Sequence, residues 1–129
     1  MDAMTNVAPL APHLDPHNLA AARLFRERWE NRVNALANCI DHLVVDHDMT
    51  EDAAELVAIQ AYADLESTNQ VARVDVDAST SHVVVLRTEG GRPVMFTVTD
   101  LMRLLEQARR EERAVVVDRD RQRPVVLEN

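Results

Sequence analysis

The chain has 129 residues, of which 47% are hydrophobic and 28% are charged, and its formal net charge is −8. This length fits one domain, and the composition excludes a wholly disordered or collagen-like chain. All 14 basic residues are arginine. Mechanisms that need a lysine Schiff base, a lysine general base or a P-loop lysine are therefore excluded.

Cysteine usage and hydropathy bear on the compartment. The single cysteine, Cys39, cannot form an intramolecular disulfide, so the chain needs no oxidising environment. No apolar run approaches the roughly 18–20 residues that span a bilayer. Residues 1–14 carry Asp2 where a signal peptide has positive charge. We therefore expect a flexible leader over residues 1–14, a cytoplasmic protein and no membrane partner; the abundance of Arg, Ala, Val and Asp suggests a bacterial source.

The first predicted element is a long helix. Asp15 is a good N-cap, and Pro16 is favoured at the first helical position. No proline or glycine follows until after residue 46, and apolar residues recur at spacings of three and four. This pattern predicts one continuous helix from residue 15 to about 46. Its apolar stripe consists of Leu19, Ala22, Trp29, Val33, Leu36, Ile40 and Leu43, with Arg26 as the one charged residue on the same stripe.

A second helix is predicted over about 50–67. Thr50 is its expected N-cap, and Glu51 and Asp52 in the first turn complement the helix dipole. Only a short polar segment separates this helix from the first. The two helices are therefore expected to form an antiparallel hairpin over residues 15–67.

Period-two alternation and β-branched runs follow the helices. We expect strands at 71–77, 83–86 and 94–98. Gly90-Gly91 predicts a two-residue type I′ turn between the last two of these strands. Such a turn fixes the register and pairs Glu89 with Arg92, Val85 with Phe96, and Val83 with Val98.

The C-terminal third predicts one more helix and two more strands. Thr99 is the expected cap of a helix over about 100–112, and strands are expected at 114–118 and 125–127. A strand, a helix and a strand in so short a span favour a βαβ crossover. The predicted fold is α+β, of order ααβββαββ: one domain over 15–129, with the hairpin (15–67) followed by a mixed sheet and one crossover helix (70–128).

The negative charge is concentrated in one part of the chain. Residues 33–72 contain no arginine and eight acidic residues: Asp41, Asp46, Asp48, Glu51, Asp52, Glu55, Asp64 and Glu66. The other 14 of the 22 acidic residues balance the 14 arginines. One interpretation is a solvated helix face; the other is a surface that attracts a basic protein through Glu51, Asp52 and Glu55.

This acidity argues against a nucleic-acid partner, because binding DNA requires cations that neutralise phosphates. A nucleic-acid role for the arginines of the third helix is the least favoured alternative, since nearby glutamates oppose them. These arginines are Arg103, Arg109, Arg110 and Arg113. Four aromatic residues in all are also too few for a base-stacking platform.

Two groups of residues are candidate metal ligands. His42 and Asp46 stand four apart on the first helix, and His47, Asp48 or an acid of the second helix could complete a divalent-metal site; a polar helix end is the alternative interpretation. The Asp75/Asp77 and Asp118/Asp120 pairs could likewise hold magnesium, or could cap turns.

No residue pattern identifies a catalytic site or a cofactor. Cys39 lies on the apolar stripe and is expected in the core. We therefore expect a non-enzymatic protein that binds another protein, with a metal-binding protein or metal-assisted enzyme using the Asp/His clusters as the alternative.

A homodimer through the first helix is a further expectation. A helix of this length measures about 46 Å and exceeds the roughly 36 Å diameter of a compact domain of 129 residues. Its first turns would then expose Phe25 and Trp29 for contact with a second copy. A kink near residues 34–38 is the competing explanation.

Overall fold

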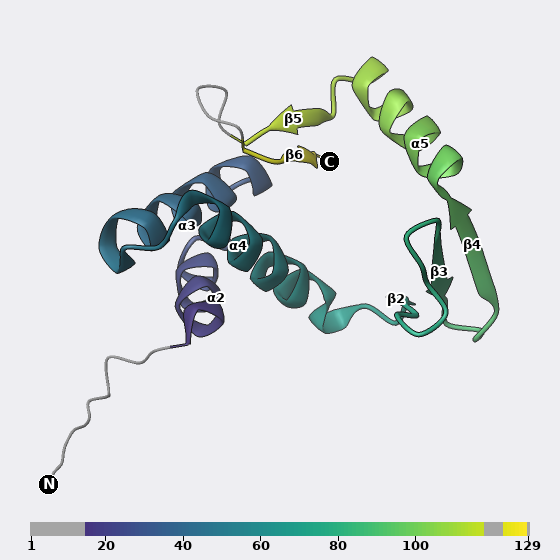
Figure 1. The fold of residues 1–129 in the computed structure, drawn as a ribbon, viewed down its shortest axis with the longest axis horizontal. Coiled ribbons are helices and arrows are strands. Elements are labelled where there is room, and N and C mark those ends of the chain that lie inside the picture. The colour runs from purple at the N-terminus through teal and green to yellow at the C-terminus, as the bar shows by residue number, and fades with distance from the viewer. Residues whose placement is uncertain (1–14, 118–122, 129) are drawn as a thin grey trace, which may run out of the picture. The chain divides into compact units, whose positions relative to one another are not determined.

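The computed structural model describes residues 15–117 and 123–128 (Figure 1); the expected leader, residues 1–14, lies outside this range. The chain divides into two compact units, Met1–Ala63 and Asp64–Asn129. The first unit is helical, and the second combines small antiparallel sheets with one long helix. The predicted α+β class is confirmed.

The predicted first helix is two helices, α2 (Pro16–Arg26) and α3 (Arg32–His47). Its start is confirmed, since the Asp15 carboxylate accepts the backbone N–H of His17 at 2.8 Å. The prediction of a continuous helix is wrong. The Asn31 side chain accepts the backbone N–H of Asn34 at 2.8 Å and starts a new helix there. The break therefore lies at residues 27–31, before the kink considered at 34–38.

The core of the first unit lies where α2 packs on α3. The buried side chains of the two helices are Ala20, Leu24, Ala35, Leu36, Cys39, Ile40 and Leu43. The Cys39 thiol donates to the carbonyl oxygen of Ala20 across a 3.8 Å S···O distance. Small residues at this contact allow the two backbones to approach closely.

Helix α4 (Glu51–Glu66) begins as predicted. The Thr50 hydroxyl accepts the N–H of Ala53 at 3.2 Å, and α3 ends at Asp48 with φ 56°. Near the other end of α4, the Arg32 guanidinium lies 5.4 Å from the centre of the Tyr62 ring, which makes α3 and α4 antiparallel. The predicted hairpin of two uninterrupted helices is nevertheless wrong, because three helices occupy its range.

The three-stranded sheet of the second unit has the order β2 (Arg73–Val74), β3 (Val83–Arg87), β4 (Pro93–Thr97), after a short 3-10 turn, η1 (Ser67–Asn69). The predicted register is wrong by one residue, since Val84 pairs with Phe96 and Val85 with Met95.

The connecting loop explains the shift. It is five residues long, 88–92, and the N–H of Gly91 donates to the carbonyl of Thr88 at 2.8 Å. Gly91 has φ 76° and is the one glycine in the left-handed region, whereas a type I′ turn needs two such residues. A one-residue shift changes every cross-strand neighbour.

Helix α5 (Val98–Arg110) begins two residues earlier than predicted because Thr97, and not Thr99, is its cap. The Thr97 hydroxyl accepts the N–H of Asp100 at 3.1 Å, and the Asp100 carboxylate accepts the N–H of Thr97 at 2.9 Å. The bond from the Thr97 backbone N–H, followed by the interaction of the carboxyl with the Thr97 side chain, holds the pKa of Asp100 below its usual value.

Strands β5 (Ala114–Val116) and β6 (Val125–Leu127) form a separate antiparallel pair. Strand β6 has its predicted bounds, and β5 begins as predicted at Ala114 but ends at Val116. The mixed sheet and the βαβ crossover are wrong, because every strand pair in the described residues is antiparallel. Helix α5 ends with Glu112 at φ 58° and the Arg113 N–H bonded to the carbonyl of Ala108 at 2.8 Å. After this turn, β5 pairs with the strand that follows it and not with β4.

Candidate functional site

Phe25, Arg28 and Trp29 form an exposed cluster, the aromatic corner, at the break between α2 and α3. The exposed fraction is 85% for Trp29 and 58% for Phe25. The Arg28 guanidinium lies 4.3 Å from the centre of the Phe25 ring and 5.2 Å from that of Trp29. Arg28 also donates to the carbonyl of Phe25 at 2.8 Å. One cation therefore contacts both rings.

Glu27 fixes the aromatic corner to the helical core. Its carboxylate accepts a hydrogen bond from Arg23 on α2 at 2.8 Å and another from the Asn38 amide on α3. Its backbone N–H bonds to the last carbonyls of α2. The chain is thus held on both sides of the break, which leaves Trp29 in the connecting turn with little contact to either helix.

This geometry changes the basis of the dimer prediction. The premise, a single helix longer than the domain, is wrong because α2 folds back on α3. Phe25 and Trp29 are nevertheless the exposed aromatic residues that the sequence pointed to. Contact of these residues with a second copy stays a prediction.

The acidic residues predicted to attract a basic partner lie in the first two turns of α4. Asp52 is exposed, whereas Glu51 and Glu55 are half-buried. Glu51 and Asp52 lie at the N-terminus of the helix, where a carboxylate stabilises the helix dipole. The three carboxylates therefore do not share one fully exposed surface.

The histidine cluster lies in the last two turns of α3. The Nδ1 atom of His42 is 2.7 Å from an Asp46 carboxylate oxygen, and the His47 ring meets the His42 ring edge-on, 4.8 Å between centres. Asp48 forms the C-cap of the helix. Within residues 15–117 and 123–128, no group of three or more His, Cys, Asp or Glu side chains is placed to hold a metal ion.

The metal hypothesis has a direct test at this pair. If the cluster binds zinc, the metal should raise the melting temperature, because a ligand bound only by the folded state stabilises that state. The variant His42→Ala should abolish the rise, since it removes the imidazole of the pair. Identical melting temperatures with and without each of a panel of divalent ions would reject the hypothesis.

Asp75, a residue of the proposed magnesium pair, caps a turn. Its carboxylate accepts the N–H of Ala78 at 3.1 Å and the Nε–H of Arg87 at 3.0 Å. The bond from Arg87, followed by that from Ala78, lowers the pKa of Asp75. The capping role that the sequence offered as the alternative for this pair therefore belongs to Asp75. The other pair, Asp118 and Asp120, lies outside the described residues.

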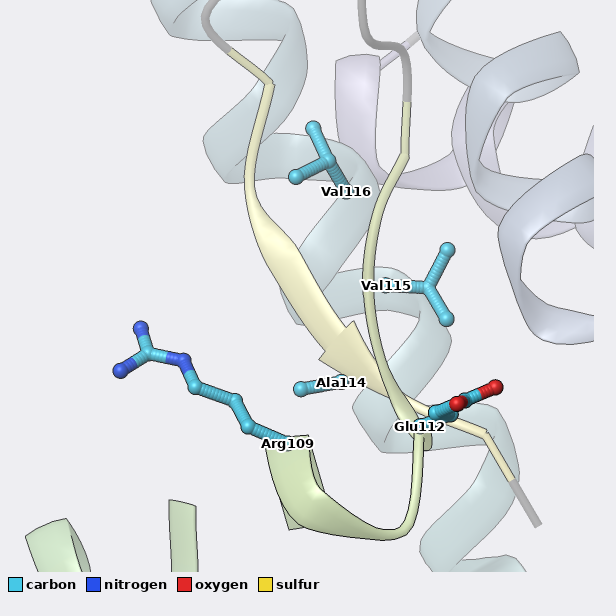
Figure 2. A pocket seen from close by; sticks show the side chains of 5 residues that line it. All are labelled: Arg109, Glu112, Ala114, Val115 and Val116. Atoms are coloured by element: carbon cyan, nitrogen blue, oxygen red, sulfur yellow. The ribbon is translucent and has the colours of Figure 1, made fainter. Parts of the chain in front are cut away.

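Two hollows in the second unit were not found from the sequence. One, of about 410 Å³, lies between β4 and α5 and is lined by Met95, Phe96, Asp100, Arg103, Leu104 and Gln107. The other, of about 560 Å³, lies beside β5 and is lined by Arg109, Glu112, Ala114, Val115 and Val116 (Figure 2). The sequence shows the β-branched residues of β5. It does not show which side of this strand lacks a neighbouring strand, because that depends on how the strands pair.

Comparison with protein-family models, with curated proteins and with solved structures finds no match for this chain. In the part of the chain that the structure describes, no helix is both long and apolar enough to cross a membrane.

Proposed function

We propose that this chain is a non-enzymatic protein-binding module and that the aromatic corner is its contact surface. The observation that carries the proposal is the exposure of Trp29, 85%, beside a stacked arginine. Tryptophan, tyrosine and arginine are the residues most enriched among those that dominate binding energy at interfaces.

The exposed area of the rings at the aromatic corner is large enough to contribute substantially to binding energy. A buried aromatic side chain removes about 150–250 Å² from water, so covering the exposed parts of Phe25 and Trp29 would gain on the order of 6 kcal/mol before the costs of association. Arg28 restrains both rings in the free protein. Side chains that are already ordered lose less entropy on binding.

The charge around the corner indicates the chemistry of the partner. Residues 23–32 contain four arginines and two glutamates, a local charge of +2 in a chain of net charge −8. An apolar pocket with an acidic rim would complement this surface. The acidic start of α4 would contact a basic region, and Asp52 is its exposed member.

Replacing Trp29 by alanine should remove the principal contact. We expect partner affinity to fall by about 30-fold or more, as for a residue at the centre of an interface. The measurement is retention of proteins from a lysate of the source cells on immobilised wild-type and variant chains. Phe25→Ala should give a smaller loss in the same direction.

Val45→Ala is the matched control for this experiment. Val45 is an exposed apolar residue of the same unit, on α3, with an exposed fraction of 77%. A protein retained by the wild type and by Val45→Ala, but lost from Trp29→Ala, supports the proposal. Equal retention by all variants contradicts it.

A further inference from the structure

The hydrogen bonds of the β5–β6 pair show which backbone groups point outward. The N–H of Val117 donates to the carbonyl of Pro124 at 3.0 Å, and the N–H of Glu128 donates to that of Arg113 at 2.7 Å. In an antiparallel pair, hydrogen-bonded and non-bonded residues alternate along each strand. Ala114 and Val116 therefore direct their N–H and C=O groups away from β6.

These four groups of β5 form an open strand edge. No hydrogen bond to them is present in residues 15–117 or 123–128. The 560 Å³ hollow lies against this strand and is lined by all three of its residues. Figure 2 shows the side chains of Ala114 and Val116 on one side of β5 and that of Val115 on the other.

The corresponding edge of β4 is protected. Val85 directs its N–H and C=O towards the β2 side of the sheet. Met95 lies opposite Val85, so its backbone N–H and C=O point away from β3, towards the unpaired edge of this sheet. The backbone groups of the alternate residues Pro93 and Thr97 point the same way. Pro93 has no N–H, and the N–H of Thr97 is bonded to Asp100. Proline and side-chain caps of this kind prevent unwanted strand pairing, and β5 has neither.

We propose that β5 pairs in antiparallel orientation with β5 of a second copy, about a two-fold axis at Val115. In this register the outward groups of Ala114 face those of Val116 in the other copy, which forms four hydrogen bonds. Among residues 114–116, a register centred on Ala114 or on Val116 would form two. The pairing converts a two-stranded ribbon, which is marginal alone, into a sheet of four strands.

Side-chain size and charge favour a second copy as the occupant of this edge. The two-fold axis places the small Ala114 beside the larger Val116 of the other copy, and residues 114–117 carry no charge. The second unit holds 12 acidic residues and 10 arginines, a net charge of −2, whereas the first holds 10 and 4, a net charge of −6. Electrostatic repulsion between two copies is therefore weaker for association through the second unit than through the first.

The variant Val116→Pro tests the pairing. Proline removes the outward N–H of Val116, which takes no part in the β5–β6 pair, and thereby deletes two of the four intermolecular hydrogen bonds. Sedimentation at high micromolar concentration should give twice the 14.5 kDa chain mass for the wild type. Val116→Pro should weaken the dimer by at least about 10-fold, and Val116→Thr, which keeps the N–H and the β-branch, should leave it intact.

Amide hydrogen exchange gives a second measurement that does not depend on the variant folding. In the wild type, protection of the Ala114 and Val116 amides should rise with protein concentration, while that of the Val117 amide, bonded within the chain, should change little. Fast exchange of the first two amides at all concentrations, or a dimer lost from Trp29→Ala and kept in Val116→Pro, would overturn the inference. The proposed function at the aromatic corner would survive the first of these results, so the two proposals fail separately.

Discussion

Replacing Ile40 by alanine should destabilise the helical unit by about 2–5 kcal/mol, the cost of deleting a buried branched side chain and leaving a cavity. Ile40 lies in the middle of α3 and is fully buried, and Leu36 and Leu43 are buried on the same helix. Urea unfolding followed by circular dichroism measures the change, which should appear as a lower midpoint with an unchanged slope.

Val45→Ala is again the control, since it removes apolar carbon atoms from an exposed position of the same helix. Its effect should stay within about 0.5 kcal/mol. Equal midpoints for Ile40→Ala and Val45→Ala would mean that the buried stripe of α3 is not the core of the unit.

Cys39 should be almost unreactive in the folded protein. Burial raises the pKa of its thiol from 9.0 to about 11, and the thiolate is the reactive form. At pH 8 this shift alone lowers the thiolate fraction by about 100-fold, and the absence of solvent at the thiol adds to the protection. Labelling with a thiol reagent should therefore follow unfolding, and rapid labelling of the native chain would contradict the assigned burial.

The same pKa shift predicts alkaline destabilisation. The unfolded chain loses the thiol proton near pH 9, while the folded chain keeps it until about pH 11. The free energy of unfolding should therefore fall by about 2–3 kcal/mol as the pH rises between these values. The chain has no lysine, the residue that dominates titration in this range in most proteins. Cys39→Ala should flatten the dependence, and an equally steep fall in that variant would assign it to other groups.

Local capping was the feature that the sequence predicted best. Asp15 and Thr50 start their helices as expected, because a side chain that bonds a nearby backbone N–H acts within a few residues. The same mechanism explains two errors. Asn31 starts a helix within the segment whose apolar periodicity predicted one continuous helix. Thr97 competes successfully with Thr99 because Asp100 completes a capping box with it.

The errors in the predicted sheet arose in segments whose residues are compatible with more than one local structure. Two adjacent glycines permit a two-residue turn or a longer loop, and in the structure only Gly91 adopts a positive φ. The choice shifts the register by one residue. The segment from β4 to β5 permits either a crossover or two separate sheets, and periodicity within a strand does not distinguish them.

The candidate site was only partly predictable for a similar reason. Phe25 and Trp29 could be named from the sequence as exposed aromatics, but through a helix that does not exist as one element. The stacking of Arg28 on both rings depends on the turn at residues 27–31. Exposure and edge availability are properties of the folded chain, and hydrophobic pattern alone does not report them.

Site-specific photo-crosslinking in the source cells tests the central claim most directly. A benzophenone amino acid is placed at position 30, an exposed position next to Trp29 that leaves the aromatic corner intact, and in a separate chain at position 45, the exposed control position on α3. We expect a discrete covalent adduct from position 30 and none from position 45, with the adduct mass separating another protein from a second copy of 14.5 kDa. The same adducts from both positions, or no adduct from position 30, would contradict the claim that this chain acts by binding a protein through the aromatic corner.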